Sequence, residues 1–306
     1  MSSLPVTDPR QSGRAFSLLE VLVATTILAV IVSLLGSIMS AVSASWTSAT
    51  DRTETGLSAR AIADYIQTDL ASAQLPVNNA DQSNLQFILN SANVPADYKN
   101  GDALFWQSPV ANDTTYGDVA EVGYFVKWIT DSKSQPKPIL CRFFVEPATS
   151  GSASSAYQIY QSPAKWLTQE IIDTVAPGTS DQNYAGLFAE NVIGIWFRCF
   201  DGQGNDYGRA FDSRTTPADS TKLRLPCSVQ VSFVVVDSRN AARLNSTLQA
   251  ALATLASSVS EAAASKDKTV SPAEEFVTRA RGDSAFKSIA AGIKAHTTTV
   301  SLVNAR

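Results

Sequence analysis

An uncharged run near the N-terminus constrains the fold more than any other part of the chain. No Asp, Glu, Lys or Arg occurs at the 30 positions from Val21 to Thr50. A helix needs about 20 apolar residues to cross the hydrocarbon layer of a bilayer. The sequence therefore predicts a membrane-spanning helix, over about residues 18–42.

The length of the run and the charges beside it indicate what kind of segment it is. A secretory signal peptide has an apolar core of about 7–15 residues, so this run is too long for one. Arg10 and Arg14 precede the run, whereas residues 51–54 carry no excess of positive charge. By the positive-inside bias, the N-terminus stays in the cytoplasm and the rest of the chain lies across the membrane.

A single acid, Glu20, stands at the start of the run. A carboxylate at membrane depth costs a few kcal/mol unless it is paired or close enough to the surface to reach water. An uncleaved single-pass anchor whose Glu20 reaches the surface is one interpretation. The other is a segment in which Glu20 has a partner.

The residues around Glu20 match a known signature. Phe16-Ser17-Leu18-Leu19-Glu20-Val21, preceded by a hydrophilic leader with arginines, resembles the F-[TS]-L-[IL]-E-[VA] motif that opens mature type IV pilins and pseudopilins. In that family a prepilin peptidase cuts before the Phe and methylates its amino group. The resemblance implies a leader of residues 1–15, a cut between Ala15 and Phe16, and N-methylation of Phe16. The family usually has Gly at the position of Ala15.

The same resemblance implies a role for Glu20 in assembly. The new amino group on Phe16 of one subunit would form a salt bridge with Glu20 of a neighbour. This contact would neutralise two charges that are otherwise stranded in an apolar helical bundle.

The helix is expected to continue beyond the membrane to about residue 75. Apolar residues recur there at spacings of three and four, which predicts one buried stripe, with Arg60, Asp64, Gln67 and Asp69 largely off it. Pro76 and the polar residues after it mark the end of the helix. The predicted stripe contains Leu57, Ala61, Ile62, Tyr65, Ile66, Leu70 and Ala73.

Residues 76–306 are expected to form the head of the protein. Segments rich in β-branched and aromatic residues alternate there with turn sequences, which is typical of strands. We therefore predict an α+β, pilin-like fold, with the long N-terminal helix packed on an antiparallel sheet. The predicted strands are NLQFILN, ALFWQSPV, EVGYFVKWIT, PILCRFFVEP, NVIGIWFRCF and CSVQVSFVVVD.

A helical insertion is predicted at about residues 240–290. The leucines from Leu244 to Leu255, with Val259, step by three and four and predict an amphipathic helix. Ser271-Pro272-Ala273-Glu274 combines a capping Ser, a Pro in the first turn and an acid three residues after the cap, so a second helix starts there. Gly282 stops this helix, and HTTTVSLVNAR is expected to form a final strand.

Sequence segments in the head extend the family resemblance. ENVIGIWFRCFDGQG followed by LPCSVQVSFVVVD is similar to the paired strands of J-type minor pseudopilins of type II secretion. With DSRNAARL and TTTVSLVNAR added, the pattern resembles the Verru_Chthon cassette protein C family of prepilin-like proteins. The resemblance implies other pilin or pseudopilin subunits, a prepilin peptidase and an inner-membrane assembly platform as partners.

An enzymatic site is not indicated. The chain has no G-x-S-x-G, H-E-x-x-H or Walker-type sequence, and its one histidine, His296, is expected to be an ordinary strand residue. We predict no catalytic residue and no cofactor. The net charge of −4 and the absence of a basic stretch argue against a nucleic-acid partner.

Two further groups of residues leave alternatives open. Asp201, Asn205, Asp206 and Asp212 could offer oxygens to Ca²⁺, but their spacing departs from the EF-hand pattern, so a polar hairpin connection is the favoured interpretation. Cys141, Cys199 and Cys227 lie in or beside predicted strands, and the sequence does not determine whether two of them form a disulfide.

These observations predict a minor pseudopilin or pilin-like structural subunit. It would lie in the cell inner membrane with its head in the periplasm, and it would assemble into or cap a short filament of a type II secretion or type IV pilus-like system. The alternative is a single-pass, membrane-anchored periplasmic binding or sensory domain that does not polymerise.

Overall fold

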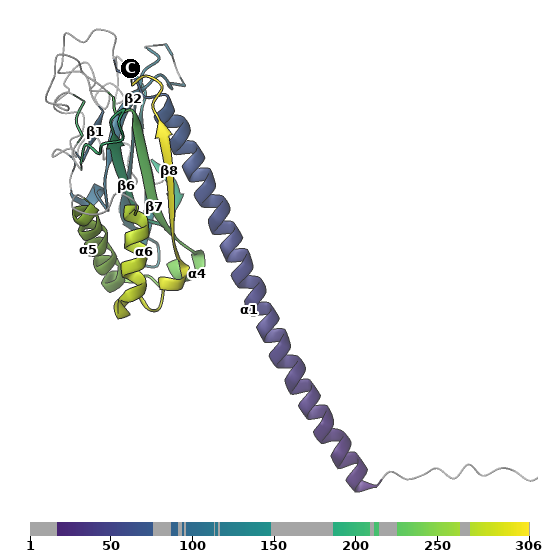
Figure 1. Cartoon of the computed structure of the whole chain (residues 1–306). Coiled ribbons are helices and arrows are strands. Elements are labelled where there is room, and N and C mark those ends of the chain that lie inside the picture. Colours follow the sequence, from purple (N-terminus) through teal and green to yellow (C-terminus); the bar gives the residue numbers. More distant parts are fainter. Residues whose placement is uncertain are drawn as a thin grey trace, which may run out of the picture. The chain divides into compact units, whose positions relative to one another are not determined.

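The computed structural model describes residues 17–75, 87–90, 94, 96–112, 114–115, 117–147, 186–208, 211–213, 225–263 and 270–305. The chain divides into two compact units, Met1–Thr50 and Asp51–Arg306, the second of which we call the head unit. Helix α1, Leu18–Ala71, supplies the described part of the first unit and the first element of the head unit (Figure 1). The α+β prediction is confirmed, since antiparallel sheets follow the long helix.

The strands form two sheets, whereas the sequence predicted one. The first sheet has five strands in the order β1-β2-β3-β4-β5, and all neighbours are antiparallel. Strand β5 was not predicted, because four residues with few β-branched side chains give a weak signal. The strands are β1 (Ile88–Leu89), β2 (Leu104–Ser108), β3 (Ala120–Thr130), β4 (Pro136–Val145) and β5 (Leu187–Glu190).

The second sheet has three antiparallel strands in the order β6-β7-β8. They are β6 (Val192–Phe200), β7 (Ser228–Val236) and β8 (Ile293–Ser301). Only Asn191 separates β5 from β6, and it adopts a φ of 63°. The tight turn at Asn191 lets adjacent segments of the chain enter different sheets.

Helices occupy the stretch between β7 and β8. They are α4 (Ser238–Ala241), α5 (Ser246–Ala263) and α6 (Pro272–Gly282), followed by the 3₁₀ turns η3 (Ser284–Phe286) and η4 (Ala290–Gly292). A further 3₁₀ turn, η2 (Ala96–Tyr98), precedes β2. The predicted cap of α6 is present as a complete capping box between Ser271 and Glu274, and the helix ends at Gly282 as expected.

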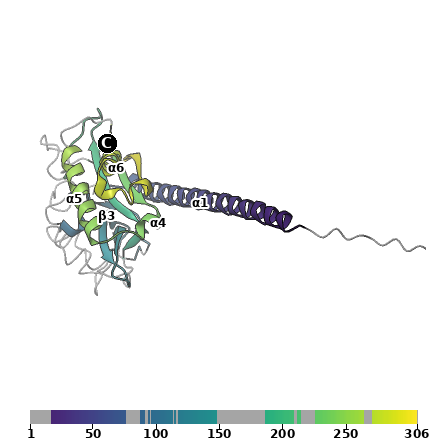
Figure 2. The ribbon, with the colours of Figure 1, turned by 90° about the horizontal axis from the view of Figure 1, so that it is seen from below.

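The strands β6 and β7 of the three-stranded sheet are buried on both faces. Alternate residues of β7, among them Val231 and Phe233, join the core that contains the buried face of α1. The residues between them, such as Val234, join a second core with α5 and α6, which lie next to each other in Figure 2. In this second core the Trp196 indole Nε1–H donates to the carbonyl oxygen of Ala256 on α5, over 3.3 Å. The sheet therefore separates α1 from the α5–α6 pair.

The buried face of α1 in the head unit is narrower than the sequence predicted. Its buried apolar residues are Ala59, Ile62, Ile66 and Leu70, at spacings of three and four, and Ala73, just after the helix ends, is buried as well. In contrast, Ala61 is exposed, and the exposed fractions of Leu57 and Tyr65 are 65% and 48%. The prediction that these three residues lie on the buried stripe was wrong, because the sheets cover only one narrow face of the helix.

Candidate functional site

The first unit presents an apolar helix that nothing in the described chain covers. The side chains described from Leu18 to Val42 are all exposed, among them Leu18, Ile27 and Leu35. Within the described residues, α1 is the one helix long and apolar enough to cross a membrane. Trp46, with an exposed fraction of 76%, lies between this apolar part and the first charged residue, Asp51.

The predicted assembly residue, Glu20, lies in the first turn of α1. Ser17 precedes α1, its hydroxyl accepts a hydrogen bond from the Glu20 N–H over 3.2 Å, and its carbonyl accepts from Val21 N–H. Ser17 therefore caps the helix, and Glu20 is the acid of its first turn. This role of Ser17 was not predicted, although Ser17-Leu18-Leu19-Glu20 has the S-x-x-E spacing of a capping box. Ala15 and Phe16, the predicted cleavage and methylation residues, lie outside the described residues.

A buried ion pair fixes the end of α1 in the head unit. The Asp69 carboxylate accepts from Arg142 Nε over 2.8 Å and from Arg142 Nη2 over 3.3 Å. It also accepts from the Tyr124 hydroxyl over 2.7 Å. The exposed fractions of the Asp69 and Arg142 side chains are 8% and 18%. The expectation that Asp69 lies off the buried face was wrong, since its partners on β3 and β4 satisfy the charge inside the protein.

Asp69, Arg142 and Tyr124 form a hydrogen-bonded cluster, and their surroundings shift the pKa values of Tyr124 and Arg142. Burial, with the negative charge of Asp69 next, raises the pKa of Tyr124 far above its ordinary value. The Arg142 pKa is also raised: burial alone would lower it, but the hydrogen bonds and charge of Asp69 outweigh that effect. The guanidinium of Arg142 further lies 4.3 Å from the centre of the Phe144 ring. Arg142 therefore stays charged, and the cluster joins α1 to the five-stranded sheet.

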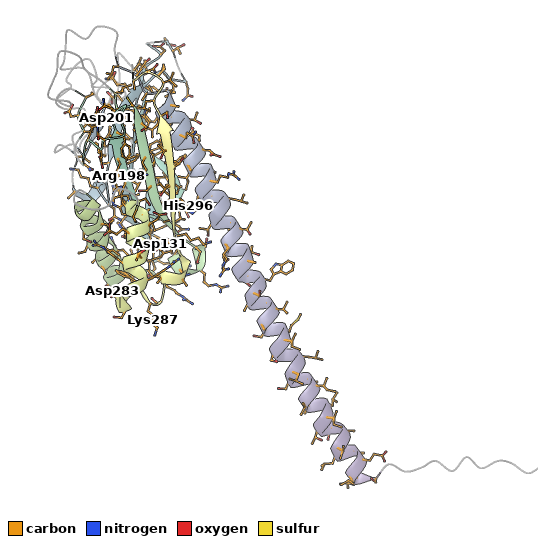
Figure 3. The ribbon with its side chains drawn as sticks, viewed as in Figure 1. Asp131, Arg198, Asp201, Asp283, Lys287 and His296 are labelled. Carbon is orange, nitrogen blue, oxygen red and sulfur yellow. The ribbon has the colours of Figure 1, made fainter. Side chains whose placement is uncertain are left out.

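Three of the four calcium candidates, Asp201, Asn205 and Asp206, lie in a tight turn after β6. The Asp201 carboxylate accepts from the backbone N–H groups of Gln203 and Asn205 and from the Asn205 side chain, each over 2.8 Å. These hydrogen bonds, led by that of Asn205, lower the pKa of Asp201. Asp206 instead accepts from Gly208 N–H over 2.7 Å. Figure 3 shows Asp201 at one end of the head unit and Lys287 at the other.

The fourth calcium candidate, Asp212, lies outside this turn and pairs with a different part of the chain. It forms a backbone bridge with Ile88, whereas Asp206 forms one with Phe200. Among the residues that the structure describes, no group of three or more His, Cys, Asp or Glu side chains is arranged to hold a metal ion. The carboxylate of Asp201 accepts hydrogen bonds from the local backbone.

The three cysteines are free thiols. Cys141 lies in β4 of the five-stranded sheet, whereas Cys199 in β6 and Cys227 beside β7 belong to the three-stranded sheet. Burial raises the pKa values of the Cys141 and Cys199 thiols, so both stay protonated at neutral pH.

The single histidine lies within β8. His296 faces Phe233 of β7, and the two rings stack with their centres 5.5 Å apart. Burial, together with the charge of Lys294, lowers the pKa of His296 below its ordinary value. This position agrees with the expectation of an ordinary strand residue.

A groove of about 460 Å³ lies beside α1 in the head unit. Residues of α1 from Glu54 to Tyr65 form one wall, and residues 188–191 with the end of β7 form the other. Its two carboxyl groups belong to Glu54 and Glu190, and Glu190 forms an ion pair with Lys137 over 2.8 Å.

The comparison with known proteins identifies the N-terminal segment. Residues 10–36 match the family model described as the prokaryotic N-terminal methylation motif. No curated protein and no solved structure matches the chain. The motif supports a type IV pilin-like or pseudopilin-like protein that is anchored by a single membrane pass, and it favours a structural subunit over an enzyme.

Proposed function

We propose that the protein is a minor pseudopilin-like subunit that assembles through its N-terminal helix into a short filament. The observation that carries this proposal is the methylation motif at the start of an exposed apolar helix. Such a helix is stable in a bilayer and, after extraction from it, among other apolar helices.

The position of the motif indicates where the precursor is cleaved and which residue is methylated. Prepilin peptidase cuts between Ala15 and Phe16, releases the leader of residues 1–15 and methylates the Phe16 amino group. Residues 18–42 cross the inner membrane, the N-terminus faces the cytoplasm, and residues 76–306, with their helical insertion at about 240–290, lie in the periplasm. The partners are other pilin-like subunits, the peptidase and the assembly platform of the inner membrane.

The size of the head favours a particular position of this subunit in the filament. At 306 residues the chain has a bulky head, which would crowd its neighbours if it were repeated along a shaft. A tip or other low-copy position accommodates such a head. The similarity to J-type pseudopilins and to the Verru_Chthon cassette protein C family favours a type II secretion or type IV pilus-like machine with unlike subunits.

The N-terminus of the mature protein tests this proposal directly. The protein is purified from membranes of the producing cell, and its N-terminal peptide is identified by mass spectrometry. A peptide that starts at N-methylated Phe16 is the expected result. An intact leader would contradict the proposal and favour a single-pass anchored binding or sensory domain.

The assembly role of Glu20 needs a variant that separates charge from helix capping. Glu20→Gln removes the charge but keeps a side chain that is accepted at this position of a capping box. Ser17→Ala removes the capping hydroxyl and keeps the charge. We expect Glu20→Gln to abolish recovery of the protein with other pilin-like subunits after mild solubilisation, and Ser17→Ala to preserve it. Equal losses in both variants would show that Glu20 acts through the helix start.

A further inference from the structure

Trp46 is the only aromatic residue between Phe16 and Tyr65. It lies in α1, and its exposed fraction of 76% shows that the described part of the chain leaves its ring uncovered. Between Val42 and Leu57 no other position carries a large apolar side chain. The ring therefore stands alone at the point where α1 changes from apolar to polar sequence.

Trp46 continues a face of α1 that carries large apolar side chains. Residues three and four positions apart lie on the same face of a helix, and such steps lead back from Trp46 to Leu28. Each apolar residue on this path has an exposed fraction of at least 53%. Acyl chains of lipids cover a face of this kind when a helix crosses a membrane. The members of the face are Leu28, Val32, Leu35, Met39, Val42 and Trp46.

The helix itself satisfies polar side chains in the part of α1 before Trp46. The Thr26 hydroxyl donates to the Val23 carbonyl over 2.8 Å, and the Ser37 hydroxyl donates to the Leu34 carbonyl over 2.8 Å. A hydroxyl without a partner is costly in hydrocarbon, where no water replaces the missing hydrogen bond. These bonds allow this part of α1 to lie within the hydrocarbon layer.

The distance between Glu20 and Trp46 matches the thickness of a bilayer. Trp46 follows Glu20 by 26 positions of one helix, which at about 1.5 Å per residue is about 39 Å. A bilayer measures about 30 Å across its hydrocarbon layer and about 40–45 Å with its headgroup regions. When Glu20 lies in one headgroup region, Trp46 therefore lies in the other. This holds for either orientation of the chain in the membrane.

We propose that Trp46 binds the lipid headgroup region of the bilayer and fixes the depth at which α1 crosses it. An indole has an apolar ring and one N–H donor, so it is most stable where acyl chains meet polar headgroups and water. Residues 47–50, which follow it, include three hydroxyl side chains, and the first charge comes at Asp51. The proposal rests on the membrane pass within the proposed function, and on neither cleavage nor filament assembly.

Fluorescence quenching in lipid vesicles tests where Trp46 lies. The purified full chain is inserted into phosphatidylcholine vesicles whose acyl chains carry bromine either near the headgroup or near the chain end. The difference between wild type and Trp46→Phe gives the signal of Trp46, separate from that of the other tryptophans. We expect bromine near the headgroup to quench this signal about twice as strongly, because Trp46 lies about 15 Å or more from the bilayer centre. Stronger quenching from the chain end would overturn the proposal.

A second tryptophan position on the same face provides the matched control. Val32→Trp combined with Trp46→Phe moves the indole by 14 positions, about 21 Å, to a depth near the bilayer centre. We expect the order of quenching to reverse in this variant. If the variant behaves so while Trp46 is quenched by neither lipid, the membrane pass stands and the proposal for Trp46 is wrong. If neither position is quenched, the membrane pass itself, and with it the proposed function, is contradicted.

Substitutions at Trp46 show whether this residue sets the depth of the helix. Thr50→Cys places a thiol at an exposed position one turn later, and its reaction with a membrane-impermeant maleimide is followed by peptide mass spectrometry. Tyrosine shares the preference of tryptophan for the interface, whereas leucine prefers hydrocarbon. We expect Trp46→Tyr to leave the labelling rate unchanged and Trp46→Leu to lower it about threefold, because the helix then lies deeper. Equal rates in the leucine and tyrosine variants would show that Trp46 does not fix the depth.

Discussion

Replacing Asp69 with asparagine should destabilise the head unit more than most single substitutions. The change leaves the Arg142 guanidinium, whose side chain is 18% exposed, without the carboxylate that lies 2.8 Å from its Nε atom. Loss of one partner of a buried pair costs about 3–5 kcal/mol, because the remaining charge stays in a poorly solvated site. For a protein of this size, we expect the melting temperature to fall by roughly 10 °C.

The assay is thermal unfolding of the purified full chain in detergent, followed by tryptophan fluorescence. Lys137→Met is the matched control, since the Lys137–Glu190 pair has the same 2.8 Å separation but exposed fractions of 28% and 44%. An exposed pair contributes about 0–1 kcal/mol, so this variant should unfold close to the wild-type temperature.

Tyr124→Phe provides an intermediate case. It removes one hydrogen bond to the Asp69 carboxylate but leaves the ion pair with Arg142 in place. A hydrogen bond to a charged group contributes about 1.5–3 kcal/mol, so the loss should lie between those of the other two variants. If Asp69→Asn cost no more stability than Lys137→Met, the cluster would not hold α1 to the five-stranded sheet, and the reasoning would be refuted.

Two further predictions concern the three-stranded sheet and its helices. Because burial lowers the pKa of His296, the unfolded chain binds a proton at higher pH than the folded chain, so the free energy of unfolding should fall as the pH drops below about 6.5. In His296→Asn the decrease in urea midpoint between pH 7 and pH 5 should be smaller; an unchanged decrease would assign it to other groups. Ser271→Ala should cost about 1 kcal/mol in urea unfolding, because the Glu274 N–H loses its acceptor, whereas Ser271→Asp should restore most of it. Equal stabilities of the alanine and aspartate variants would contradict a capping role.

Much of the local structure could be predicted from short stretches of sequence. Three features depend only on the types of residues that are close together in the sequence. They are the uncharged, membrane-length segment after Glu20, the cap at Ser271 and the end of α6 at Gly282. The six strands predicted before the helical insertion and the final strand after it were also found, since β-branched and aromatic runs bounded by turn residues carry that information locally. The candidate assembly motif was recognised in the same way, although its cleavage position lies outside the described residues.

The helix α1 shows where local reasoning failed. Periodicity placed Leu57, Tyr65 and Ile66 on one stripe, but only Ile66 is buried. The width of a buried stripe depends on what packs against it, and this information lies in strands far along the chain. For the same reason the buried Asp69 could not be recognised, because its partner Arg142 is 73 positions away.

The sequence by itself determined that this protein carries a membrane-length helix with a methylation motif, a head rich in strands, and a capped helical insertion. These features depend on side-chain type and on spacing between near neighbours. Only the tertiary structure decided that the strands form two sheets and that Asp69 is buried against Arg142. Each of these depends on which distant segments meet, because strand pairing and charge burial are set by contacts across the fold.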